Sequence, residues 1–161
     1  MRYVSTRAAA PVLDFSETLL TGLAADGGLY VPESWPQLAD GGRGNYVETA
    51  VEVMSPFVGD AIDTDAFAAM VADAYRGFKF DEVTPLVELG DGLHLLELFH
   101  GPTLAFKDVA LQLVGRLFDH ELNRRDERVT IVAATSCDTG SAAIEACRDR
   151  ENLDIVILHP A

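Results

Sequence analysis

A chain of 161 residues can bury one hydrophobic core, and a composition that is 48% apolar and 24% charged is that of an ordinary globular protein. The formal net charge of −14 at pH 7 argues against nucleic acid and anionic membrane surfaces as partners, because both would repel the chain. The sequence shows no signal peptide, no apolar run of membrane-spanning length and only two cysteines, Cys137 and Cys147, so we expect a reduced, cytoplasmic protein.

The N-terminal residues predict short elements of both kinds. Residues 2–7 are typical of a strand. Residues 15–24 predict a helix with Asp14 or Ser16 as its cap, and its apolar stripe consists of Leu19, Leu20 and Leu23. Asp26-Gly27-Gly28 then predicts a turn before an extended segment, Leu29-Tyr30-Val31, which Pro32 stops.

Two amphipathic helices are predicted after a loop. The segment from Pro32 to Gly44 holds two prolines and three glycines, which indicates a loop in which Trp35 packs as an anchor. Apolar residues at helical spacing predict helices over residues 46–57 and 64–78, the second capped by Thr64 or Asp63. Residues 1–80 therefore predict a mostly helical N-terminal lobe without obvious chemistry.

Residues 81–161 have the pattern of an α/β domain. Leu86–Leu89 and Leu93–Phe99 flank Gly90-Asp91-Gly92 and predict a β-hairpin. The helix after Lys107 has an expected buried face of Phe106, Ala110, Leu113, Val114, Leu117 and Phe118, and Gly115 within it suggests close packing. Buried strands over 129–134 and 154–159, with a helix over 141–150 between them, predict one βαβ unit with parallel strands in an incomplete sheet.

Lys107 occupies an unusual place for a cation. The preceding extended run ends at His100, Gly101-Pro102 breaks the backbone, and the helix is predicted to begin near Phe106. The helix dipole places partial positive charge at this end and favours the neutral amine, which is the form that attacks a carbonyl. Since Lys79 is the only other lysine, Lys107 is the candidate for a Schiff base. The alternative is a solvated surface lysine, with Asp108 as a first-turn acid that interacts with the dipole.

The segment Thr135–Ser141 is a second candidate site. It places hydroxyl groups and backbone N–H groups between a strand and the helix that follows, where α/β proteins bind anions and other ligands. The alternative is that Thr139 or Ser141 is simply a helix N-cap. Neither a G-x-G-x-x-G nor a Walker pattern is present, so we do not expect a nucleotide site.

Three separated motifs resemble the threonine synthase family of pyridoxal-phosphate enzymes, which have a tryptophan-synthase-β-like fold. The run ELFHGPTLAFKD at residues 97–108 is similar to the family's cofactor-lysine segment, and ATSCDTGS at 134–141 is similar to its A-T-S-G-D-T-G segment. The opening YVSTR and the later DGGLYVP at residues 26–32 resemble its N-terminal region. The resemblance covers most of the chain, in the expected order.

The resemblance implies a carbon–oxygen lyase that converts O-phospho-L-homoserine and water to L-threonine and phosphate. Lys107 would bind pyridoxal 5′-phosphate and later move the proton at the substrate's Cα. The hydroxyl-rich turn would bind the substrate through Thr135, Ser136, Asp138 and Thr139, with Asp138 positioning the loop, because an acid would repel the substrate carboxylate. His100 could face this site, or it could be a loop histidine hydrogen-bonded to backbone.

Two departures from the family pattern carry expectations of their own. Cys137 stands where the family has glycine, and a Cβ there would cost about 1 kcal/mol or more, and could block the pocket, if the position needs a positive φ or close approach of the substrate. The resembled enzymes also continue well beyond 161 residues, through the cofactor-phosphate loop and the partner of the pyridine nitrogen. We therefore expect an N-terminal fragment, inactive alone, with residues 1–80 as the family's helical lobe and 81–161 as the truncated start of the cofactor domain. Unpaired sheet edges could support self-association.

Other functions remain open. The chain could come from another enzyme of the same fold, such as a threonine dehydratase or a cysteine synthase, or it could be a non-catalytic remnant. A remote alternative makes Cys137 a nucleophile activated by a helix N-terminus, with His100 or His159 as its base.

Overall fold

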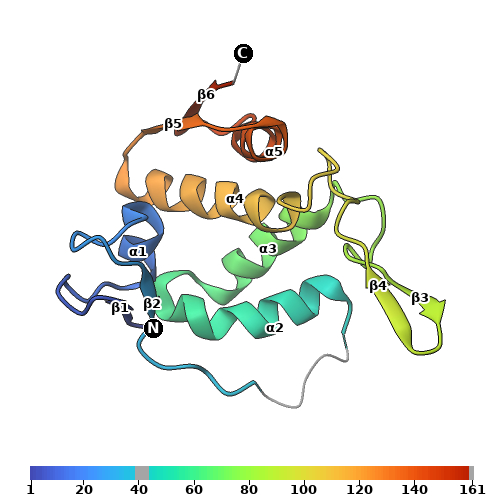
Figure 1. The fold of residues 1–161 in the computed structure, drawn as a ribbon. Helices are drawn as coiled ribbons and strands as arrows, with labels where there is room; N and C mark the ends of the chain where they lie inside the picture. Colours follow the sequence, from blue (N-terminus) through green and yellow to red (C-terminus); the bar gives the residue numbers. More distant parts are fainter. Residues whose placement is uncertain (39–43, 160–161) are drawn as a thin grey trace. The chain divides into compact units, whose positions relative to one another are not determined.

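The computed structural model describes residues 1–38 and 44–159 (Figure 1). The chain divides into two compact units, Met1–Ala69 and Met70–Ala161. The division lies within helix α3 (Thr64–Tyr75), and the domain boundary predicted near residue 80 stays a prediction. In the described part of the chain, no helix is both long and apolar enough to cross a membrane.

The first unit begins with a small antiparallel sheet and a short helix. Strand β1 (Tyr3–Ser5) pairs with β2 (Tyr30–Pro32), so the second strand includes the proline that was expected to stop it. Helix α1 (Phe15–Thr21) has Asp14 as its cap, since the Asp14 carboxylate accepts from the Glu17 N–H at 2.8 Å. The predicted stripe is wrong at Leu23, which is exposed because the helix ends at Thr21.

Both predicted helices of this region are present, as α2 (Tyr46–Val58) and α3, with a 3₁₀ turn, η1 (Gly59–Ala61), between them. Asp63 caps α3, because its Oδ1 accepts from the N–H groups of Asp65 and Ala66. The loop predicted over Pro32–Gly44 has no regular structure over 33–38, and residues 39–43 lie outside the described residues. Trp35 contacts Phe57 edge to face at 6.2 Å although 72% of Trp35 is exposed.

The Asp26 carboxylate organises the predicted Asp26-Gly27-Gly28 turn. It accepts the Ser5 hydroxyl at 2.7 Å and three backbone N–H groups, those of Ala9, Ala10 and Gly28, each at 2.9 Å. These bonds, the Ser5 bond foremost, lower the pKa of Asp26 from 3.8 to about 2 against an opposing effect of burial.

The second unit contains both segments in which the sequence predicts functional residues. Strands β3 (Leu86–Gly90) and β4 (Leu93–Leu96) form the predicted hairpin, which is exposed along its whole length. Helix α4 (Asp108–Arg125) leads to β5 (Val129–Ala134), α5 (Cys137–Cys147) and β6 (Leu153–Leu158). Strands β5 and β6 are parallel, with Val129 opposite Leu153 and Ala134 opposite Leu158, as the βαβ pattern predicts.

Several burial predictions for this unit are wrong. Phe106 is 58% exposed because it precedes α4, and Ala110 is exposed as well. Strands β5 and β6 alternate in burial, so Val132, Val156 and Leu158 are exposed instead of buried. In the described part of the chain, this sheet has only two strands, which fits the expected incomplete sheet; self-association through its edges stays a prediction.

The ion pair between Asp73 and Arg116 joins the end of α3 to α4. Arg116 Nε donates to Asp73 Oδ2 at 2.6 Å, and Arg116 Nη2 donates to the Asp73 carbonyl at 3.0 Å. Burial alone would raise the pKa of Asp73, but the Arg116 hydrogen bond and the charges of Arg116, Arg76 and Arg150 together lower it. The pair therefore favours the charged carboxylate.

Helices α4 and α5 approach each other closely at Gly115. A Cβ added to Gly115 would collide with the backbone carbonyl oxygen of Ala146, which confirms that this glycine marks close packing. Ala142 and Ala146 are buried on α5, and Leu113 and Leu117 are buried on α4. Small residues on both helices thus allow the contact that sets the spacing between α4 and α5.

Substitution of this glycine tests the contact. Alanine in a helix interior normally stabilises relative to glycine, by about 1 kcal/mol. We expect Gly115→Ala to do the opposite and to lower the free energy of unfolding by about 1–3 kcal/mol, because backbone must move. Gly77→Ala is the matched control, since open space surrounds that Cβ position, and we expect no loss. Urea titration of both variants measures the difference, and equal stabilities would contradict the contact.

The Asp26 cluster makes a pH-dependent contribution to stability. Because the folded pKa lies below the unfolded value, the contribution is complete above pH 3.8 and is lost as the pH falls through about 2. Ser5→Ala should raise the pKa of Asp26, and Asp26→Asn should make stability less steep in this acid range. The Asp26 carboxyl resonance, followed by NMR against pH, checks the first expectation. A midpoint near 3.8 in the unmodified protein would show that the cluster does not act in this way.

Candidate functional site

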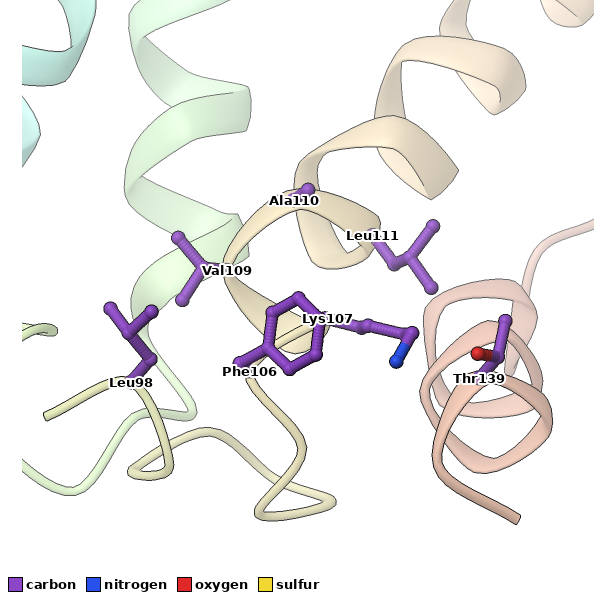
Figure 2. A pocket seen from close by; sticks show the side chains of 7 residues that line it. All are labelled: Leu98, Phe106, Lys107, Val109, Ala110, Leu111 and Thr139. Atoms are coloured by element: carbon purple, nitrogen blue, oxygen red, sulfur yellow. The ribbon is translucent and has the colours of Figure 1, made fainter. Parts of the chain in front are cut away.

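A cavity of about 420 Å³ lies beside the beginning of α4 (Figure 2). Its walls are mostly apolar, and its lining consists of Leu98, Phe106, Lys107, Val109, Ala110, Leu111 and Thr139. Within this lining, the amine of Lys107 and the hydroxyl of Thr139 are the two side-chain groups able to bind or react with a polar ligand. The cavity therefore joins the two segments that the sequence singled out.

Lys107 reaches this cavity from the start of α4. It is the N-cap residue, with φ −65° and ψ −20°, one position before the first residue of the helix. Its side chain is half-buried, and Nζ lies 4.2 Å from the centre of the Phe106 ring, a cation–π distance. Lys79, in contrast, is exposed. The two lysines of the chain thus have different surroundings, and Lys107 is the one beside a cavity.

Helix α5 begins earlier than its sequence pattern predicts, and this changes the second segment. Ser136 is the N-cap residue, without a side-chain capping bond, and Cys137 is the first helical residue. Thr139 and Ser141 therefore lie inside the helix, and the interpretation of either as N-cap is wrong. Thr139 faces the cavity (Figure 2).

The other predicted substrate-binding residues do not line this cavity. Ser136 and Asp138 are exposed, and Thr135 is half-buried. The Thr135 hydroxyl makes only a long hydrogen bond, 3.4 Å, to the Ser136 carbonyl. The structure thus brings Lys107 and Thr139 together and leaves the remaining three at or near the exposed beginning of α5.

Cys137 has a helical backbone rather than a left-handed one. It belongs to α5 and is absent from the described residues with positive φ. Its backbone therefore does not demand glycine, and the strain expected from a positive φ is not present, whereas a pocket blocked by the Cys137 side chain stays a prediction. The thiol is free and exposed, whereas Cys147 is free and buried, and burial raises the pKa of Cys147.

His100 is buried away from the cavity lining. Its Nε2 lies 2.6 Å from Glu97 Oε2, and its ring contacts Phe80 and Phe99 with centroid distances of 4.7 and 4.6 Å. The described partner of the His100 ring is therefore a carboxylate rather than backbone, and His100 is not among the residues that line this cavity. Only the His100 carbonyl bonds to backbone, where it accepts from the Lys79 N–H at 3.0 Å.

Asp108 and Thr103 form an interaction that sequence reasoning missed. Asp108 is 0% exposed, and its carboxylate accepts from the Thr103 N–H at 2.7 Å and from the Thr103 hydroxyl at 2.8 Å. A Cβ on Gly101 would lie 2.5 Å from the Asp108 Cβ, so glycine is required there for close approach. The available signal was a threonine directly after the Gly101-Pro102 pair and an acid five residues later, at the predicted beginning of the helix.

Comparisons with known proteins identify one family. The family model described as threonine synthase N terminus matches residues 2–75. Threonine synthase from Pseudomonas aeruginosa is 54% identical over 165 aligned positions, which cover 99% of this chain and 35% of that protein. Threonine synthase-like 2 from Homo sapiens is 40% identical over 99% of this chain and 34% of that protein.

Solved structures of threonine synthases are also similar to this chain. The crystal structure of PLP-bound threonine synthase from Brucella melitensis matches with a TM-score of 0.96 and 54% identity, over 99% of this chain and 36% of that one. Threonine synthase from yeast matches with a TM-score of 0.94 and 40% identity, over 99% of this chain and 35% of that one. The chain thus spans about a third of the length of the relatives it matches.

The two thiols should differ in reactivity. We expect iodoacetamide to modify Cys137 well before Cys147, because one thiol is exposed and the other is buried with a raised pKa. Peptide mass spectrometry after partial labelling measures the order, and Cys137→Ser is the control that should leave only slow labelling. Labelling of Cys147 before Cys137 would contradict the burial of the Cys147 thiol. The expected preference of iodoacetamide for Cys137 is explained by the difference in burial between the two thiols. It is therefore not evidence for a thiol enzyme, which would also require a base beside Cys137.

Proposed function

The chain belongs to the threonine synthase family, and from this premise we propose that Lys107 is the amine that binds pyridoxal 5′-phosphate in a threonine synthase. The observation that carries the proposal is the placement of this amine beside an apolar cavity with the Thr139 hydroxyl in the same lining. The reaction proposed for the whole enzyme converts O-phospho-L-homoserine and water to L-threonine and phosphate. The PLP-bound relative from Brucella melitensis supports the choice of cofactor.

The cavity suits one part of the cofactor. Its volume of about 420 Å³ lies within the usual range for small-molecule sites, and its apolar walls suit an aromatic ring. Lys107 supplies the amine for the aldehyde carbon. The lining contains no second cation and no array of donors for a phosphate group. The residues present therefore fit the reactive end of the cofactor, and we propose that groups outside this lining hold its phosphate.

Lys107 and the cavity walls would have different roles in the reaction. Bound pyridoxal phosphate supplies an electron sink for carbanion chemistry. Lys107 would hold the cofactor through its amine and would remove and return protons at the substrate carbon atoms when that amine is free. The apolar walls beside Lys107 would give the cofactor ring a surface to pack against.

We propose that Thr139 binds the substrate carboxylate, because its hydroxyl lies in the same cavity lining as the Lys107 amine. Thr135, Ser136 and Asp138 are assigned to the substrate-binding segment by family resemblance, with Asp138 as a positioning residue. Their exposed or half-buried positions at the beginning of α5 leave them available to contact substrate or further chain.

Three alternatives to a threonine synthase were open from the sequence, and each is compared with an observation. A threonine dehydratase or cysteine synthase would share the lysine and the hydroxyl segment, but the family model and the relatives described above are threonine synthases or threonine synthase-like. A non-catalytic role stays open for the isolated chain, whose cavity lining lacks phosphate donors, and we propose that this chain alone is inactive. The thiol mechanism, with His100 or His159 as base, gains no support from these relatives, which are threonine synthases or threonine synthase-like. A cytoplasmic location stays a prediction.

Chemical trapping tests the role of Lys107. We expect borohydride reduction of the chain with pyridoxal phosphate to leave a stable pyridoxyl group on Lys107, found by peptide mass spectrometry. Lys107→Arg should abolish this modification because arginine offers no amine that can bond the aldehyde carbon. Lys79→Arg is the matched control at the only other lysine and should leave the modification unchanged. Equal modification of Lys79 and Lys107 would overturn the proposal, since it would show only general amine reactivity.

A further inference from the structure

We propose that Asp108 is a positioning residue for Lys107, which acts with Thr103 as a clamp on the turn that precedes α4. The clamp is the pair of side chains Asp108 and Thr103. It holds segment 101–107 against the start of the helix, and thereby directs the Lys107 amine to the cavity. This inference rests on the proposed function for what the amine does, but the clamp itself is a property of the turn.

The clamp is a buried carboxylate with specific donors. The Asp108 Oδ2 atom accepts from the Thr103 N–H at 2.7 Å, and both carboxylate oxygens lie within 2.9 Å of the Thr103 hydroxyl. The residue has no exposed surface, and none of its described hydrogen bonds or ion pairs involves a cation. A buried carboxylate is costly unless it is hydrogen-bonded, so these bonds and the N-terminal end of α4 must hold it.

The turn contains a backbone conformation that needs support. Leu104 has φ 64°, in the left-handed region that a bulky residue rarely adopts, and 71% of Leu104 is exposed. Since the side chain buries little surface, packing of Leu104 itself does not explain the conformation. The Leu104 N–H donates to the Gly101 carbonyl at 3.1 Å, and the clamp fixes Thr103 just before it.

Lys107 lies between two fixed points. On its C-terminal side, its carbonyl accepts from the Leu111 N–H at 2.9 Å, which ties it to the first turn of α4. On its N-terminal side, the Asp108 carboxylate reaches back to Thr103, and the Asp108 N–H donates to the Ala105 carbonyl at 3.0 Å. The backbone of Lys107 is thus held from both directions, so its side chain leaves the helix toward the cavity and Thr139 (Figure 2).

A purely structural role for Asp108 and a positioning role predict different effects of its substitution. If Asp108 only stabilises the fold, its loss should act like any other destabilising substitution in the same unit. If it positions Lys107, its loss should change the turn and the amine even where global stability is matched. The two lysines make this distinction measurable, because Lys79 is an exposed internal standard in the same molecule.

The experiment uses the full 161-residue chain without cofactor and compares Thr103→Val, Asp108→Asn and Thr103→Ser. Amide hydrogen exchange is followed at residues 103–105, and the ratio of Lys107 to Lys79 acetylation is measured by mass spectrometry after brief treatment with acetic anhydride. We expect Thr103→Val and Asp108→Asn to speed exchange in the turn about tenfold, as loss of a hydrogen bond to a charged group implies. The acetylation ratio should rise because the amine leaves the cavity wall, and Thr103→Ser should keep both values near the unmodified ones.

Leu117→Val is the stability control, because it removes a buried methylene from α4 without touching the turn. If this control changes the turn and the lysine ratio as much as Asp108→Asn does, or if Asp108→Asn changes neither, the clamp is not a positioning device. Trapping with pyridoxal phosphate is then repeated on the same variants, with less product at Lys107 expected for Thr103→Val and Asp108→Asn. Failure of the unmodified chain to trap cofactor at Lys107 would count against the proposed function, whereas the acetylation ratio would still decide the clamp.

Discussion

The contact between α4 and α5 at Gly115 is the constraint on which the candidate site depends. Because Gly115 has no side chain, the Ala146 carbonyl can lie where a Cβ would otherwise be. The axes of the two helices can therefore approach closely, and Lys107 at the beginning of α4 shares one cavity with Thr139 in α5. Two residues separated by a whole helix and strand become one site through packing and not through any bond between them.

The sequence predicts those parts of this unit that depend on local patterns. The limits of β5 follow from a run of apolar residues bounded by polar ones, and the parallel pairing with β6 follows from the helix between them. The beginning of α5 does not follow in the same way, because the segment from Thr135 to Ser141 offers several possible caps in succession. In the folded chain the helix extends back to Cys137, with Gly140 buried and its N–H bonded to the Ser136 carbonyl at 3.2 Å, and local propensity cannot register that choice.

The failures of the burial predictions have two physical origins. Leu23 and Phe106 lie outside the helices to whose apolar faces they were assigned, and Val132 lies on the exposed face of a strand that was expected to be buried on both faces. A periodic pattern indicates which face of an element is apolar, but another element must be present to cover that face. Strands β5 and β6 have one covered face and one exposed face in the described chain, so alternation replaces the full burial that the apolar run suggests. Asp108 is the opposite case: aspartate is rarely buried in proteins, yet Asp108 is fully buried because Thr103 satisfies its carboxylate.

The distribution of charge explains how Lys107 can remain available in so acidic a chain. With a net charge of −14, most cations have carboxylates nearby, and the ion pairs of the described residues involve arginine or histidine but not lysine. Asp108 is adjacent to Lys107 in sequence, but neighbouring residues of a helix do not face each other, and its carboxylate points back to Thr103. The acid that could immobilise the amine in an ion pair is thus engaged elsewhere. Arginine forms the pairs that hold the fold, while the compact amine of lysine, the better suited of the two to covalent chemistry, is left beside the cavity.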